Sequence, residues 1–197
     1  MSRIEKVAVE SWDRELREMV QADAATPLEQ GAMRMFAHNP VLAKGIVGMF
    51  VALKQGRNLP ERLIELVRLR VAYHNQCRSC MAIRYRDAVQ DGVTEDLVCS
   101  LEQPMQAENL TAAEKAALQY ADLFANDHLS IDERTYADLR EHFDEAQIVE
   151  LGTRVALYVG VGRLAATWDM TEELPEVFRD KSRARVAPWS GEPVVVR

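Results

Sequence analysis

The stretch that decides the fold spans residues 61–91 and reads ERLIELVRLRVAYHNQCRSCMAIRYRDAVQD. Its first half places apolar residues at intervals of three and four, which predicts an amphipathic helix that begins after Pro60. The run after Cys77 and Cys80 predicts a second helix that ends at Gly92, because glycine is a common helix terminator. The stretch therefore predicts two antiparallel helices with both sulfurs on one face of the first turn of the second helix.

The Cys-x-x-Cys pair has the spacing of a reactive dithiol, which can close reversibly into a disulfide. Asn75 is placed to cap the second helix, and Arg84 is predicted to lie one turn beyond Cys80. Helix N-termini and cations lower a cysteine pKa from about 8.5, so the sequence favours a thiolate at Cys80. Reduced, inert thiols and a metal site are the alternatives, but a structural zinc site needs four ligands and no second such pair follows. We predict redox-active thiols, no metal and no cofactor.

Charge, hydropathy and cysteine content exclude several classes of protein. The chain has 197 residues, with 24 lysines and arginines against 31 acidic residues, and a net charge of −7. This balance argues against nucleic acid and anionic membranes as partners. The charged first residues do not resemble a secretory signal, and no apolar run reaches the roughly 18 residues of a membrane span. Three cysteines make no disulfide framework. We expect one compact cytoplasmic protein.

Strand signals are almost absent, which predicts an all-α protein. Helices are expected where capping residues precede apolar periodicity, at 12–22 behind Ser11, 41–53 behind Asn39-Pro40, 95–101 behind Thr94, 112–125 behind the Thr111–Glu114 capping box, 131–143, and 145–168 behind Asp144. We divide the chain into an N-terminal helical segment (1–38), a core (39–170) and a C-terminal tail (171–197). The tail is extended at 194–197 and contains Pro188, Gly191 and Pro193, which predicts a flexible or partner-docking end.

Two further expectations concern packing. Gly152, Gly160 and Gly162 weaken the last helix intrinsically, which predicts close contact with a neighbouring element. Cys99 falls on the apolar pattern of its helix and is expected in the core.

The chain resembles the carboxymuconolactone decarboxylase superfamily, in its alkylhydroperoxidase AhpD-like branch. The resemblance rests on a helical glutamate, Glu65, followed twelve residues later by the Cys-x-x-Cys pair and then by a helix that ends in glycine. It extends to segments that look like the family's C-terminal helical pair, namely 120–122, 142–143, 149–151 and 163–165. It implies an all-α, AhpD-like helical bundle built from helical hairpins, in a homo-oligomer that is a trimer or a hexamer.

The resemblance also implies roles for single residues. Cys80 would be the thiolate that attacks a hydroperoxide, Cys77 the partner that resolves it, and Glu65 the start of a proton relay, which favours a partly buried acid over a solvated one. The chain departs from the family at Arg84, because the peroxidase members have a histidine there. Arginine cannot act as a base, but it can stabilise a thiolate or bind an anion. His74 is either a substitute relay or an ordinary packed residue.

Two functions are therefore expected from different classes. The first is a thiol-dependent peroxidase or disulfide oxidoreductase, with a hydroperoxide or other small-molecule substrate and a thiol reductant protein as electron donor. The second is a non-redox member of the same fold, either a decarboxylase-like or isomerase-like enzyme on a carboxylated substrate held by Arg84, or an oligomeric binding protein. The arginines around the cysteines either pair with surface acids or form a local positive site at the thiols.

Overall fold

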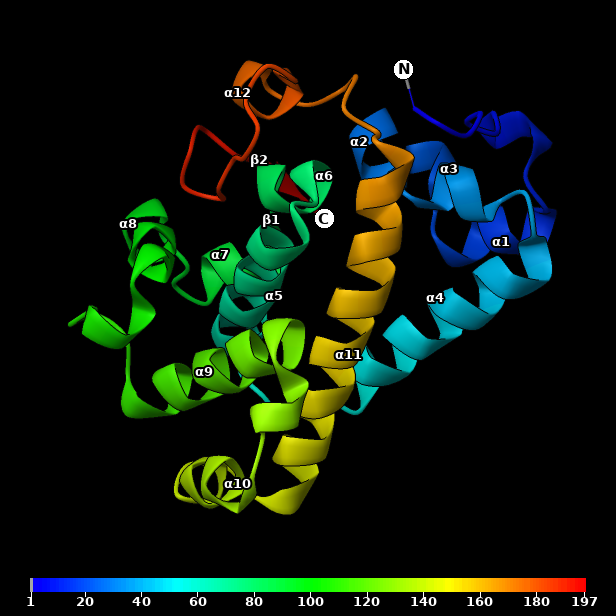
Figure 1. Ribbon diagram of the computed structural model, residues 1–197. Helices are drawn as coiled ribbons and strands as arrows, with labels where there is room; N and C mark the ends of the chain where they lie inside the picture. Colours follow the sequence, from blue (N-terminus) through cyan, green and yellow to red (C-terminus); the bar gives the residue numbers. More distant parts are fainter. Residues whose placement is uncertain (1) are drawn as a thin grey trace.

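Helix α5 (Glu61–Asn75) lies at the centre of the computed structural model, which describes residues 2–197. It packs against α9 (Ala112–Asn126) and α11 (Glu145–Trp168), and Figure 1 shows the three helices crossing in the middle of the molecule. Nine of the residues of α5 are buried, from Leu63 to Ala72. Helix α9 begins with the predicted Thr111–Glu114 capping box, and α11 begins at the predicted Asp144 cap, which also forms a capping box with Gln147. The prediction of an all-α, AhpD-like bundle is confirmed.

The other elements, all short except α4, surround this centre. They are α1 (Arg14–Met19), α2 (Pro27–Gln30), α3 (Met33–Phe36), α4 (Pro40–Gln55), α6 (Arg78–Ala82), β1 (Ile83–Tyr85), α7 (Arg86–Gln90), α8 (Glu95–Cys99), α10 (Glu133–Arg140), α12 (Glu176–Arg179) and β2 (Val194–Val196). Helix α4 begins at the expected Asn39 cap with proline at its first position. No helix in residues 2–197 is both long and apolar enough to cross a membrane.

The N-terminal segment packs on α4 and on the last turns of α11. The edge of Phe36 meets the ring of Trp168 at a centroid distance of 5.0 Å, and Trp12 is buried in the same cluster. The predicted helix over 12–22 is shorter than expected, because Asp13 caps α1 instead of Ser11 and the helix stops at Met19. This segment therefore forms one wall beside the centre of the molecule.

The segment after the cysteines differs from the prediction. A continuous helix to Gly92 is wrong, because α6 ends at Ala82 and β1 separates it from α7. The buried guanidinium of Arg68 accounts for the break, since it donates to the backbone O atoms of Cys80 (2.6 Å) and Ile83 (3.0 Å). A continued helix would use those two carbonyls as acceptors for its own N–H groups.

The C-terminal tail is docked on this interrupted segment. Strand β2 pairs in parallel with β1, with Ile83 opposite Val194, and Figure 1 shows the short red strand beside α6. Arg78, between the two cysteines, donates to backbone O atoms of the tail, which are those of Phe178, Asp180 and Arg183. The expected extended end is confirmed, but it pairs with its own chain and is not a free end.

Two of the three glycines of α11 have close neighbours. A Cβ on Gly162 would lie 2.6 Å from the side-chain nitrogen of Asn75, and one on Gly152 would lie 3.1 Å from the hydroxyl of Tyr120. Gly160 has open space around its Cα. The predicted close packing therefore holds at Gly152 and Gly162 and fails at Gly160.

Candidate active site

The two cysteine sulfurs are bonded to each other, with Cα atoms 5.2 Å apart. Cys77 is the N-cap residue of α6 and is completely buried, whereas Cys80, in the first turn, is partly exposed. The expected cap is wrong, because the side chain of Asn75 instead donates to the backbone O of Tyr158 and accepts from Arg163. The structure thus gives the two sulfurs different access to solvent.

Cys80 lies in the wall of a cavity of about 510 Å³, which is within the size range of small-molecule sites. The cavity is formed between the N-terminal segment, the cysteine segment, α11 and the tail. Its walls are mostly apolar, and they include Leu28, Met33, Phe36, Phe50, Leu157 and Val161. Polar side chains that line the same cavity include those of Ser79, Arg68, Tyr85 and Tyr158. An apolar molecule in this cavity would therefore share the space with one partly exposed sulfur.

Glu65 is buried and reaches the cysteine segment through Arg68. Arg68 holds both carboxylate oxygens of Glu65 at 2.7 Å, with Nε and Nη2, while Nη1 donates to the backbone O of Cys80. Burial alone would lower the pKa of Arg68, but the Glu65 carboxylate outweighs it and raises that pKa. The structure therefore brings Glu65 and Cys80 together, as expected, but with a permanent cation between them.

The guanidinium of Arg84 is held by Glu95 and by backbone carbonyls, away from the cavity. Its side chain is 1% exposed, and its Nε and Nη2 atoms both pair with the carboxylate of Glu95 at 3.0 Å. It also donates to the backbone O atoms of Met81, Ile83 and Pro188. The sequence placed this charge over the Cys80 sulfur, but the helix is broken between the two residues and Arg84 does not line the cavity. Arg84 instead joins the cysteine segment to the tail.

His74 and Cys99 also differ from the expectations. His74 contacts Asp122 through Nε2 at 2.6 Å, and its Nδ1 lies 3.2 Å from the side-chain nitrogen of Asn126. Both ring nitrogens are therefore occupied, which favours the packed residue over the relay. Cys99 is exposed, so its expected place in the core is wrong.

The sequence indicated Arg68 only as one of several arginines that could form a positive site at the thiols, and it gave no sign of Tyr158 as a member of the site. A signal for Arg68 was available, because an acid and a base at positions i and i+3 of a mostly apolar helix, Glu65 and Arg68, are expected to pair. Tyr158 has no comparable signal, since tyrosine in an apolar helix face is ordinary core. In the structure burial raises the pKa of the Tyr158 phenol, which keeps it protonated at neutral pH.

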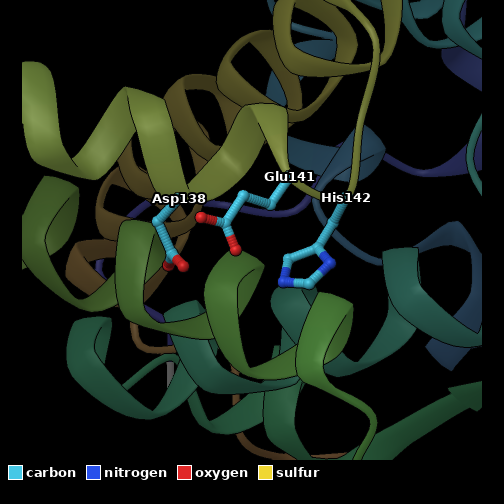
Figure 2. Close-up of side chains that lie close together, drawn as sticks. All are labelled: Asp138, Glu141 and His142. Carbon is cyan, nitrogen blue, oxygen red and sulfur yellow. The ribbon is translucent and has the colours of Figure 1, made fainter.

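A separate group of possible metal ligands lies at the end of α10. Asp138, Glu141 and His142 each offer one ligand atom, and these atoms lie within 4.8 Å of one another. Figure 2 shows the three side chains gathered together. All three side chains are exposed, and exposed acidic groups of this kind are common without a metal. The group adjoins the start of α11, about 36 Å of helix away from the end of α11 that lies nearer α6 (Figure 1). It is not part of the cysteine site.

Comparison with known proteins agrees with this geometry. Residues 40–123, which include α5 and both cysteines, match the model of the carboxymuconolactone decarboxylase family. Residues 40–123 are therefore similar to this family. The fold is AhpD-like, because the chain superimposes with a TM-score of 0.71 on the crystal structure of the alkylhydroperoxidase AhpD core of an uncharacterized peroxidase-related protein from Ralstonia eutropha JMP134. That superposition covers 94% of this chain and 98% of the other at 18% identity, so it establishes the fold.

Two uncharacterized bacterial proteins are more similar to the chain in sequence. An uncharacterized protein of Mycobacterium tuberculosis (strain H37Rv) is 33% identical over 117 residues, which are 58% of this chain and 40% of that protein. The uncharacterized protein YdfG of Bacillus subtilis (strain 168) is 31% identical over 93 residues, which are 44% of this chain and 60% of YdfG. The chain therefore matches between two fifths and three fifths of the length of these relatives.

Proposed function

We propose that this AhpD-like protein reduces hydroperoxides with Cys80 as the attacking thiolate and Cys77 as the resolving thiol. The observation that carries the proposal is the difference between the two bonded sulfurs. Cys80 lines an apolar cavity, whereas Cys77 is buried behind it. A substrate in the cavity can meet Cys80, and Cys77 is held where it can attack only its partner.

The proposed reaction has three steps. The Cys80 thiolate attacks the terminal oxygen of ROOH, so that an S–O bond forms, the O–O bond breaks, and the departing alkoxide takes a proton to become ROH. The Cys77 thiol then loses its proton and attacks the sulfenic sulfur, which forms the disulfide, and the departing hydroxide takes up a proton and leaves as water. Two thiol groups of a reductant, for which we propose a thiol reductant protein, restore the dithiol and become a disulfide themselves.

The surrounding residues have assigned parts in this proposal. Arg68 fixes the backbone at Cys80 through the 2.6 Å hydrogen bond to its carbonyl oxygen and provides a nearby positive charge, which the Glu65 carboxylate partly offsets. Tyr158 lines the same cavity with a raised pKa and supplies the proton for the alkoxide. Arg84 has no direct part. The alternative of a carboxylated substrate held by Arg84 is less well supported, because that guanidinium is buried against Glu95.

The experiment is a thiol count on the fully reduced protein before and after one equivalent of cumene hydroperoxide, followed by mass mapping of the disulfide. We expect the loss of two thiols and a Cys77–Cys80 bond, with Cys99 still free as an internal control. With the same hydroperoxide, the Cys80→Ser variant should keep all its thiols. The Cys77→Ser variant should form a sulfenic acid at Cys80 that dimedone traps. If Cys77 and Cys80 stay reduced over minutes with this hydroperoxide, the proposal is wrong and the non-redox alternative gains.

We also propose that the chain forms a homo-oligomer, as expected for a trimer or hexamer. Apolar side chains stay exposed along α4 and α11, notably Val41 (79%), Leu42 (53%), Met49 (47%) and Val149 (68%). Exposed apolar patches of this kind are common at interfaces between proteins. Light scattering at micromolar concentration tests this, and a monomeric mass would refute it.

A further inference from the structure

Arg34, in the N-terminal segment outside the matched family region, has an unusual set of contacts. Its side chain is only 11% exposed, and it lines the cavity that contains Cys80. Its Nη1 pairs with Glu173 at 3.0 Å. Its Nε atom is buried and has no hydrogen-bond partner among residues 2–197, and no side-chain hydrogen bond to Nη2 is found there either. One edge of this guanidinium is therefore free.

The free edge is the one that three other arginines of the chain use for a carboxylate. Three arginines donate from Nε and Nη2 to the two oxygens of one acid, in the pairs Arg68–Glu65, Arg70–Asp122 and Arg84–Glu95. The planar fork of arginine matches the two oxygens of a carboxylate in this arrangement. A buried donor without a partner is disfavoured, so a carboxylate of a molecule in the cavity that Arg34 lines would be stabilised on reaching this edge.

We infer that the cavity binds a molecule with an apolar body and a carboxylate, and that the Nε/Nη2 edge of Arg34 holds the carboxylate. The apolar body lies among Met33, Phe36, Phe50 and their neighbours, with its far part against Cys80. Together with the proposed function, this inference makes the substrate a hydroperoxide of a fatty acid, and in that respect it rests on the proposed function.

A smaller hollow of about 400 Å³ also borders Arg34, but Lys6, Glu10 and Asp23 give it a charged lining that does not suit an apolar body. The two acids that line the larger cavity, Glu29 and Glu173, are already paired with cations, Glu29 with Arg197 and Glu173 with Lys6 and Arg34.

Binding of palmitate tests the carboxylate site without any redox step. We would measure it by calorimetry in the Cys80→Ser protein, with hexadecanol as the matched ligand that lacks the carboxylate. Loss of one bidentate, charge-assisted contact should weaken palmitate binding by about 10- to 100-fold in Arg34→Gln. Arg34→Lys keeps the charge without the fork and should recover only part of the affinity. Arg17→Gln, at an arginine of the same segment that does not line the cavity, should bind as the parent does.

Turnover then tests the substrate class. The ratio of kcat/KM for linoleic acid hydroperoxide to that for its methyl ester should exceed 10 in the unaltered protein and fall toward 1 in Arg34→Gln. Equal palmitate affinity in Arg34→Gln and its parent, or hexadecanol binding as tight as palmitate, overturns the inference. Near-UV circular dichroism of each variant confirms the fold.

The two proposals fail in different ways. Arg34-dependent palmitate binding without any hydroperoxide reduction rejects the proposed function and keeps the carboxylate site. Hydroperoxide reduction with no preference for the free acid over the ester keeps the function and rejects the carboxylate site.

Discussion

Replacement of Arg84 by methionine should destabilise the protein strongly, because the guanidinium is buried among fixed acceptors. The ion pair with Glu95 contributes little to the loss, since that carboxylate is about half exposed and water can take over. In Arg84→Met the backbone O of Ile83 still accepts a hydrogen bond from Arg68. The backbone O atoms of Met81 and Pro188 each lose the hydrogen bond from the charged guanidinium of Arg84. At roughly 1.5 kcal/mol for each lost charged donor, the free energy of unfolding should fall by about 3 kcal/mol. This corresponds to a Tm lower by about 6–12 °C.

Urea unfolding followed by far-UV circular dichroism measures this change. The matched control is Arg86→Met, two residues along. Arg86 is exposed and its side chain makes no hydrogen bond or ion pair with residues 2–197, so the effect should stay within about 0.5 kcal/mol. The assignment of Arg84 is refuted if Arg84→Met costs no more than Arg86→Met. It is also refuted if Arg84→Met leaves stability intact but slows alkylation of Cys80 at pH 7, because that result would return Arg84 to the thiolate.

Three further outcomes are expected. Gly160→Ala should stabilise α11 by up to about 1 kcal/mol. Gly162→Ala should instead destabilise the protein, since its Cβ would lie 2.6 Å from a neighbouring amide nitrogen. Thermal melts of the two variants test both expectations. Arg78→Met should release the tail, so that trypsin cleaves after residues 181–185 several-fold faster than in the unaltered protein, and equal rates would show that Arg78 does not hold it. The backbone N–H of Thr26 lowers the pKa of Glu29 from 4.5 to about 2, opposed in part by burial. Because the folded state favours the ionised carboxylate, its stabilisation is complete above pH 4.5 and is lost as the pH falls toward 2, and Glu29→Gln should flatten the stability curve in that window.

The sequence predicts much of the fold because the long helices carry local signals. The Thr111–Glu114 and Asp144–Gln147 capping boxes and the Asn39-Pro40 start each place a helix N-terminus at the observed residue. The break after Ala82 has no local signal, since the residues after it are compatible with helix. It arises from Arg68, which lies on a different helix and binds the carbonyls that helix continuation would use. Tertiary contacts of this kind override local propensity.

The residues of the candidate site likewise fall into those that the sequence predicts and those that depend on tertiary contacts. Cys77, Cys80 and Glu65 were predicted from spacing and resemblance, and the structure places them close together. Arg84 was assigned from helical spacing, and that argument failed when the helix broke. Arg34 had no signal at all, because the cavity joins segments more than forty residues apart in the chain.

The central claim is that Cys80 reduces a hydroperoxide and Cys77 resolves it. The most direct measurement is the amount of alcohol formed when the reduced protein meets excess cumene hydroperoxide with no reductant present, followed by rapid quenching. The account predicts one alcohol per chain for the unaltered protein, with a Cys77–Cys80 disulfide as the other product. It predicts one alcohol and a stable sulfenic acid at Cys80 for Cys77→Ser, and none for Cys80→Ser. Alcohol formation that survives Cys80→Ser, or that is absent from the unaltered protein, would contradict it.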